Sequence, residues 1–154
     1  MKTIILYATK YGAAEETAGR IAEKINGAAA FNLKKGSIPS LADFECVIVG
    51  SGVYAGNILK EAKTFLAQNE KILSEKKLGL FLCGMGTEGE TYFNSNFPAS
   101  LLESAKAKSL LGGIFDPKKA NAFERFIIKI VTKSSAYINT ISERRIEQFA
   151  KAMQ

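Results

Sequence analysis

The sequence contains no histidine and only two cysteines among its 154 residues. Histidine is the commonest metal ligand and the usual general base near neutral pH, so its absence excludes catalytic triads, most zinc sites and imidazole acid–base chemistry. Cys46 and Cys83 lie in separate apolar runs, which predicts two small buried thiols rather than a disulfide framework. Any chemistry of this chain must therefore proceed without histidine.

The sequence also lacks any apolar run near the roughly 18 residues that a membrane-spanning helix needs. Its N-terminus enters a strand-like segment without the pattern of an export signal, so we expect a cytoplasmic protein. A length of 154 residues with 47% hydrophobic side chains suits one core. Since neither a long internal repeat nor a linker is evident, we expect a single domain over residues 1–154.

The charge of the chain is unbalanced, because 21 Lys and Arg residues face 15 Asp and Glu residues and give a net charge of +6. Such a surface attracts anions: phosphates, nucleic acid, acidic partner proteins or an anionic membrane face. The sequence has no cluster of basic and aromatic residues and no recognisable nucleic-acid-binding motif, so we expect no nucleic acid partner. Phosphates, acidic partner proteins and an anionic membrane face remain candidates.

Short apolar runs alternate with amphipathic segments along the chain. The runs are apolar on both faces, which is typical of strands buried in a parallel sheet. We predict strands at residues 2–7, 28–33, 46–50, 78–83 and 109–115. Helical spacing predicts helices at residues 14–25, 58–73, 120–137 and 142–153, and Pro98 is expected to open another. This alternation predicts a doubly wound α/β domain, with a five-stranded parallel sheet between two layers of helices.

The first, third and fourth predicted strands each end in a loop that contains glycine. In doubly wound sheets, ligands bind outside the carboxyl ends of the strands, so we expect these loops to meet at one crevice. The candidate binding residues are Thr9, Lys10, Tyr11, Gly12, Ala13, Ala14 and Glu15 in the first loop, Ser51, Gly52, Val53, Tyr54, Ala55 and Gly56 in the second, and Cys83, Gly84, Met85 and Gly86 in the third.

The first loop joins a strand to a helix N-terminus, where unpaired N–H groups and the helix dipole favour an anion. Thr9 can add a hydroxyl and Lys10 a positive charge, while Gly12 allows close approach of the backbone. We predict a phosphate site here; the alternative is a plain strand–helix turn. The loop is neither a Walker A loop nor G-x-G-x-x-G, which argues against nucleoside triphosphate hydrolysis and dinucleotide-dependent dehydrogenation.

The second loop places Tyr54 between two glycines, an arrangement that suits a flat ring stacked on an aromatic side chain. The third loop, with Gly84 and Gly86, can supply N–H donors to the edge of the same ring. Taken singly, each loop could be a surface turn. Together with a phosphate loop they describe a mononucleotide with an extended aromatic head.

At these residues the chain resembles the flavodoxin family, whose members bind FMN with a phosphate loop after the first strand and isoalloxazine loops after the third and fourth. The resemblance covers nearly the whole chain and implies a flavodoxin-like fold with strand order 2-1-3-4-5. In the family the first loop typically reads T/S-x-T-G-x-T. Here Thr9 and Gly12 match, whereas Tyr11 and Ala14 replace two hydroxyl positions.

The resemblance also implies a role for each loop. The first-loop residues would hold the FMN phosphate, Tyr54 would stack on the ring, and the third-loop residues would meet the pyrimidine edge. The peptide between Ala55 and Gly56 would turn its carbonyl toward flavin N5 when the flavin gains a proton. Tyr92 is a further candidate for contact with the ring, with a place in the core or at the rim as the alternative.

The segment from Phe123 to Lys133 is similar to one in the flavodoxin-domain, menaquinone-dependent protoporphyrinogen oxidases. It has an apolar helical stripe, and basic residues recur every four positions on another face: Arg125, Lys129 and Lys133. One interpretation is an ordinary amphipathic helix packed on the sheet. The other is a helix that rests on an anionic membrane surface or receives a carboxylate-bearing substrate.

Two classes of function follow. In the first, FMN does the redox chemistry and the protein sets its potential. This class includes an enzyme that oxidises protoporphyrinogen with a quinone acceptor and a soluble electron carrier that docks on redox partner proteins; the pI near 9.3 favours the enzyme. In the second, a flavodoxin-like domain without cofactor serves as a binding module, which the missing loop hydroxyls would permit.

Overall fold

The computed structural model describes residues 1–119, 121–132 and 137–154. Five of its strands pair in parallel in the order β2-β1-β3-β5-β6. They are β1 (Thr3–Ala8), β2 (Ala29–Asn32), β3 (Cys46–Tyr54), β5 (Lys77–Cys83) and β6 (Ala107–Leu110). The short strand β4 (Asn57–Ile58) joins the same sheet antiparallel to β3. The predicted order 2-1-3-4-5 is therefore confirmed for the parallel strands.

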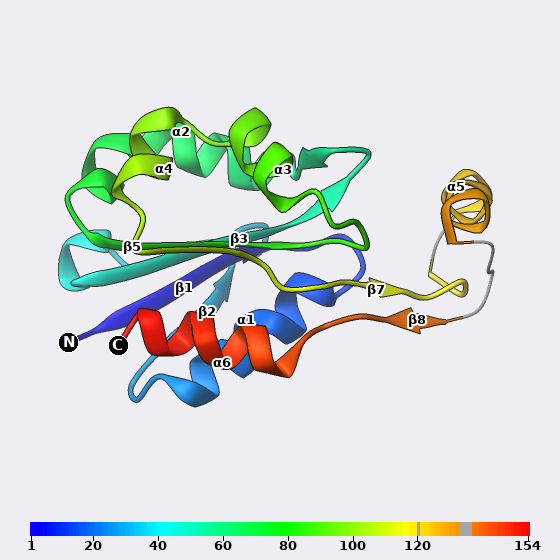
Figure 1. Cartoon of the computed structure of the whole chain (residues 1–154). Coiled ribbons are helices and arrows are strands. Elements are labelled where there is room, and N and C mark those ends of the chain that lie inside the picture. The colour runs from blue at the N-terminus through cyan, green and yellow to red at the C-terminus, as the bar shows by residue number, and fades with distance from the viewer. Residues whose placement is uncertain (120, 133–136) are drawn as a thin grey trace.

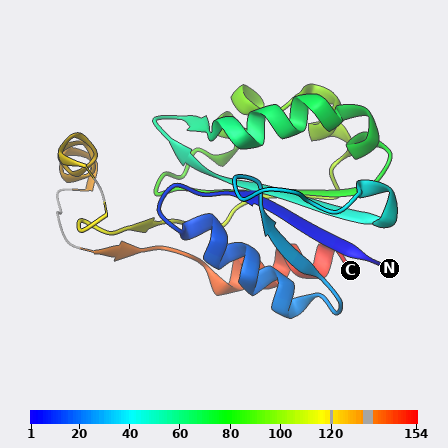
Figure 2. The ribbon, with the colours of Figure 1, turned by 180° about the vertical axis from the view of Figure 1, so that it is seen from behind.

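Helices cover both faces of the sheet, which gives the three predicted layers (Figures 1 and 2). One face carries α1 (Ala13–Lys24) and α6 (Glu143–Ala152), and the other carries α2 (Lys60–Ser74), α3 (Gly89–Asn96) and α4 (Ala99–Ser104). A 3-10 turn, η1 (Leu41–Asp43), precedes β3.

Successive side chains of β1 pack alternately into two apolar cores, one on each face of the sheet. Ile4 and Leu6 belong to the apolar cluster on the α2 side, and Ile5 and Tyr7 to the cluster on the α1 side. Because strand side chains alternate between faces, a strand covered on both faces needs apolar residues throughout. This burial explains the continuous apolar run of the first predicted strand.

The centre of the sheet is packed tightly. Phe81 on β5 is 0% exposed, and its ring lies directly over Gly50 of β3. A Cβ atom added at Gly50 would lie 2.0 Å from the Phe81 ring, so only glycine fits there. Cys46 and Cys83 are both free and buried, as predicted.

Two strands and a helix project from the layers after β6. Strands β7 (Ile114–Phe115) and β8 (Ile138–Asn139) pair antiparallel, and α5 (Ala122–Thr132) stands at the far end of this ribbon (Figures 1 and 2). We call β7, α5 and β8 the arm. Among the described residues, none of the helices combines the length and the apolar character needed to cross a bilayer.

Several predicted boundaries were wrong in this part of the chain. The fifth strand, expected at residues 109–115, is β6 and ends at Leu110; Gly112 has a φ of 97°, and β7 beyond it pairs in a separate sheet with β8. The helix expected at residues 120–137 is described only over α5; residues 120 and 133–136 lie outside the described residues, and Tyr137 is not helical.

Two further expectations need correction. Of the two interpretations of the segment from Phe123 to Lys133, packing on the sheet is wrong for α5, which lies away from the sheet (Figure 1). Its side chains Phe123, Phe126 and Ile130 are exposed. Residues 89–96, to which no element was assigned from the sequence, form α3, which packs through the buried ring of Phe93. Pro98 stands at the N-cap of α4, so the predicted helix start there is confirmed.

Candidate functional site

The three predicted loops meet at the carboxyl ends of β1, β3 and β5. The backbone N–H of Lys10 in the first loop donates to the Tyr54 hydroxyl of the second, at 3.1 Å. Gly84 of the third lies against Val53 of the second, where an added Cβ would be 3.6 Å from the Val53 Cβ. The predicted convergence of these segments is thus present in the fold.

The first loop is a tight turn into α1. The Thr9 hydroxyl accepts from the Gly12 N–H at 2.9 Å, and Gly12 is the N-cap of α1 with a φ of 104°. Apart from the neighbouring residues of the chain, no atom lies within 4 Å of a Cβ added at Gly12, so this side of the turn is open. Ala14 is fully buried on the sheet side of α1 and offers only its backbone where the family motif has a hydroxyl.

The second segment is strand rather than loop for most of its length, which corrects the prediction for residues 51–56. Ser51 and Gly52 lie buried within β3, and the Ser51 hydroxyl accepts from the Leu59 N–H at 3.1 Å. Ser51 therefore supports the backbone. The turn consists of Ala55 and Gly56, with φ values of 50° and 80°, as a two-residue hairpin between β3 and β4 requires.

Tyr54 folds back over its own strand. A Cβ added at Gly52 would lie 2.5 Å from the Tyr54 hydroxyl, so the glycine makes room for this ring. The Tyr11 ring meets it edge to face at a centroid distance of 6.0 Å, and Lys10 Nζ lies 5.6 Å from the Tyr54 centroid. Burial raises the pKa of the Tyr54 hydroxyl, which stays neutral. Tyr54 thus borders the first loop as well as the second.

Side-chain amides hold the carbonyls of the hairpin turn. Asn57 Nδ2 donates to the Ala55 carbonyl at 3.1 Å, and Asn96 Nδ2 donates to the Gly56 carbonyl at 2.9 Å. Asn96 also accepts from the Ile58 N–H through Oδ1. Sequence reasoning missed Asn96, because it comes from α3, 40 residues farther along the chain than Gly56.

The third loop divides into a buried and an accessible part. The Cys83 thiol donates to the Thr17 hydroxyl at 3.3 Å, and burial raises its pKa to about 12. Gly84 N–H donates to the Gly112 carbonyl, where the arm leaves the sheet. Met85 and Gly86 lie nearer the surface, with the Tyr92 hydroxyl close to Gly86. Of the predicted third-loop residues, Cys83 faces the core and not a ligand.

A carboxylate from the arm lies on the first loop. Glu124 of α5 accepts a hydrogen bond from the Tyr11 hydroxyl through Oε1, and its Oε2 lies 3.4 Å from Lys10 Nζ. Partial burial raises the pKa of Glu124, but the donors Tyr11 and Asn121 and the charge of Lys10 outweigh this and hold the pKa below its ordinary value. The group is therefore charged at neutral pH. Nothing in the sequence linked it to a loop 113 residues away.

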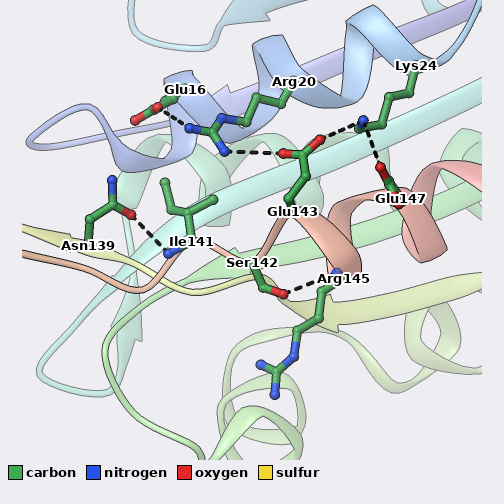
Figure 3. A network of polar contacts seen from close by, with 9 residues as sticks. All are labelled: Glu16, Arg20, Lys24, Asn139, Ile141, Ser142, Glu143, Arg145 and Glu147. Carbon is green, nitrogen blue, oxygen red and sulfur yellow. Dashed lines mark hydrogen bonds and ion pairs between the residues drawn. The ribbon is translucent and has the colours of Figure 1, made fainter.

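The helix that follows the first loop is fixed to α6 by ion pairs (Figure 3). Glu143 of α6 lies 2.6 Å from Lys24 Nζ and 3.2 Å from Arg20 Nη1, both on α1. The Ser142 hydroxyl caps α6 by accepting from the Arg145 N–H at 3.2 Å. The network joins the helix that carries the first loop to the chain that returns from β8.

The first loop already binds an anionic side chain next to aromatic rings. Lys10 and Tyr11 hold the Glu124 carboxylate beside the start of α1, and the Tyr54 ring of the second segment lies against Tyr11. A cavity of about 570 Å³ opens elsewhere, among residues such as Glu90, Lys108 and Arg145. Tyr54 and Glu124 pack closely against the first loop.

Comparison with known proteins gives the family of this fold. A family model described as the flavodoxin domain matches residues 4–140. No curated protein matches the chain. Rubredoxin oxygen:oxidoreductase from Desulfovibrio gigas shares the fold with a TM-score of 0.59 and 16% identity over 99% of this chain and 35% of that one. This chain thus spans about a third of the length of that oxidoreductase.

Two smaller proteins share the fold. The two-electron reduced flavodoxin of Megasphaera elsdenii has a TM-score of 0.60 and 13% identity, over 98% of this chain and 97% of that one. A flavoprotein from Lactobacillus acidophilus, solved in complex with FMN, has a TM-score of 0.54 and 18% identity, over 73% of this chain and 91% of that one.

Proposed function

The chain belongs to the flavodoxin domain family, and from this premise we propose that it binds FMN at the three loops and transfers electrons through the flavin. The observation that carries the proposal is the meeting of an anion-holding turn at Lys10 and Tyr11 with the aromatic and glycine-bearing ends of β3 and β5. FMN supplies redox chemistry that needs no histidine. The FMN complex of the Lactobacillus flavoprotein supports this choice of cofactor.

The proposed site uses the predicted residues in two ways. Lys10, Tyr11 and the N–H groups of residues 13–15 hold the phosphate, since the start of α1 favours an anion. Thr9 and Gly12 shape this turn. Val53, Tyr54, Ala55, Gly56, Gly84, Met85 and Gly86 border the ring, while Ser51, Gly52 and Cys83 support them from within the sheet.

Spectral titration of the apoprotein tests this proposal. FMN is expected to bind and to turn the protein yellow, and riboflavin, which lacks the phosphate, to bind more weakly. Lys10→Gln should lower the affinity for FMN by about three- to tenfold, because it removes a positive charge beside the phosphate. It should leave the affinity for riboflavin unchanged. Lys34→Gln, at an exposed loop lysine, is the matched control. A parent protein that keeps no yellow colour after incubation with millimolar FMN and removal of the free FMN would instead be the cofactor-free binding module.

A soluble electron carrier needs a redox partner protein. The net charge of +6 favours an acidic partner, because opposite charges speed encounter and orient the complex. Such an association is expected to weaken as salt is raised from about 50 to about 500 mM.

A second candidate is an enzyme that oxidises protoporphyrinogen and passes the electrons to a quinone. The arm favours it, because Phe123 is 71% exposed and Phe126 and Ile130 are each 60% exposed, on a helix that touches the first loop through Glu124. An apolar face beside Lys129 suits a flat carboxylate-bearing substrate or an anionic membrane surface from which a quinone is reached.

Turnover of protoporphyrinogen with menadione as acceptor separates the enzyme from the carrier. If the arm receives substrate or membrane, Phe126→Ser should lower turnover while FMN stays bound. Phe31→Ser, which removes a ring from β2 near the opposite edge of the sheet, is the control. A parent protein that holds FMN but shows no turnover is the carrier.

A further inference from the structure

The first loop and the arm share one hydrogen-bonded contact. The Tyr11 hydroxyl and the Lys10 ammonium, which the proposed function assigns to the phosphate, both engage Glu124 in this structure. Glu124 comes from the first turn of α5, on a segment that leaves the sheet after Gly112. The same donors therefore connect a ligand site to a projecting element.

A phosphate and Glu124 cannot both use these donors fully. A tyrosine hydroxyl has one proton and donates to one acceptor at a time. Lys10 has three protons, but two anionic groups within about 4 Å of one another repel unless the cations between them compensate. Binding of one group at this turn therefore opposes binding of the other.

Glu124 has a second set of partners within its own helix. Its Oε1 also accepts from the Asn121 N–H at 3.2 Å, and its own N–H donates to Asn121 Oδ1 at 2.8 Å. This reciprocal pair is a capping box, which satisfies N–H groups at the start of a helix. The start of α5 thus keeps its cap when Tyr11 and Lys10 are taken by another anion.

We propose that Glu124 is a built-in competitor for the phosphate end of the ligand, so that a bound phosphate monoester displaces Glu124 and releases α5 from the first loop. The inference rests on the proposed function, because it takes the phosphate to be that of FMN. By linkage, the arm lowers the affinity for FMN by the same factor by which FMN weakens the docking of the arm.

Titrations with FMN and with riboflavin test the competition. Glu124→Gln keeps the shape of the side chain and removes its charge. It should raise the affinity for FMN by about three- to tenfold and change the affinity for riboflavin by less than about twofold. Glu103→Gln removes an exposed carboxylate on α4 and should change neither. Equal FMN affinity in the parent and Glu124→Gln, or equal tightening of both ligands, would overturn the proposal.

Amide hydrogen exchange measures the release directly. FMN should speed exchange in residues 122–132 of the parent protein, and riboflavin should not. In Glu124→Gln the FMN effect should shrink. Slower exchange in α5 with FMN would mean that the arm closes over the ligand, which would refute the proposal. If no variant binds FMN, the proposed function fails; if all bind it equally, only the competition fails.

Discussion

The three layers of the protein, which we call the body, and the arm both contain apolar segments, but they differ in how these segments are buried. Phe81 on β5 is 0% exposed between Gly50 and the helices, whereas Phe126 on α5 is 60% exposed. Phe81 lies in a strand that is apolar nearly throughout, and Phe126 lies on the apolar stripe of a helix. An apolar pattern in the sequence therefore identifies an apolar segment without identifying what covers it, because the covering elements are distant in sequence.

The body and the arm also differ in how they are held. At the base of the arm, Thr140 N–H donates to the Gly113 carbonyl at 2.8 Å, and Gly113 N–H donates to the Thr140 hydroxyl at 3.0 Å. Among the described residues of α5, Glu124 contacts the first loop through its carboxylate, at Lys10 and Tyr11. We therefore expect substitutions in the body or at the base to change global stability, and substitutions on α5 to leave it nearly unchanged.

A matched pair of phenylalanine truncations gives the largest contrast. Phe81→Ala should lower the free energy of unfolding by about 3–5 kcal/mol, because it opens a cavity at the centre of the sheet. Phe126→Ala should change it by no more than about 0.5 kcal/mol, as is usual for an exposed side chain. Urea unfolding of both variants provides the measurement. A comparable loss for Phe126→Ala would mean that α5 is part of the cooperative core.

A pair of glycine substitutions tests the base of the arm. Gly112 has a φ of 97°, and a Cβ there would lie 2.1 Å from the Thr140 carbonyl oxygen, so Gly112→Ala should cost about 3 kcal/mol or more. Gly27 has a φ of 78° and no atom within 4 Å of its added Cβ, so Gly27→Ala should cost only about 1 kcal/mol. Equal losses of stability in thermal unfolding would show that the backbone around Thr140 shifts to accommodate the added methyl group.

The sequence was sufficient to predict most of the body. Residues 2–7, 46–50 and 78–83 are apolar nearly throughout because both faces of their strands are buried, and short runs of this kind are typical of a parallel sheet covered on both sides. The fifth strand was placed wrongly, because apolar residues continue from Leu110 to Phe115 although Gly112 turns the chain away. The pattern could not distinguish a strand in the sheet from a ribbon beside it.

The candidate site was predicted less completely than the fold. The convergence of the three segments follows from parallel topology, which places the ends of β1, β3 and β5 at one edge. Glu124 and Asn96 were missed because their contacts with the site depend on tertiary packing across long separations in sequence. The inward direction of Cys83 follows from strand alternation, a signal that was available in the sequence.

The Cys83 thiol offers a probe of the body alone, because both cysteines lie outside the arm. Burial raises its pKa to about 12, so the unfolded chain loses this proton from about pH 8.5 while the folded chain keeps it. The stability of the fold should therefore fall as pH rises through this window, by about 2 kcal/mol at pH 10. Cys83→Ala should flatten that slope in urea unfolding, and an unchanged slope would assign it to other groups.

The smallest expected effect compares a carboxylate of the body with one of the arm. The hydrogen bond from Lys24, with the charges of Lys24 and Arg20, lowers the pKa of Glu143. Its contribution to stability is therefore present above the ordinary glutamate pKa of about 4.3 and is lost as pH falls through the lowered value. At pH 7, Glu143→Gln should lower Tm by about 1 °C, a difference that should shrink as pH falls below the ordinary glutamate pKa.

Glu124→Gln is the counterpart in the arm. The pKa of Glu124 is also lowered, but its partners Tyr11 and Lys10 join α5 to the first loop rather than α1 to α6. Because the release of α5 does not require the body to unfold, this substitution should leave Tm unchanged from pH 7 to pH 3 while it alters FMN affinity. A loss of Tm equal to that of Glu143→Gln would show that the arm and the body unfold as one cooperative unit.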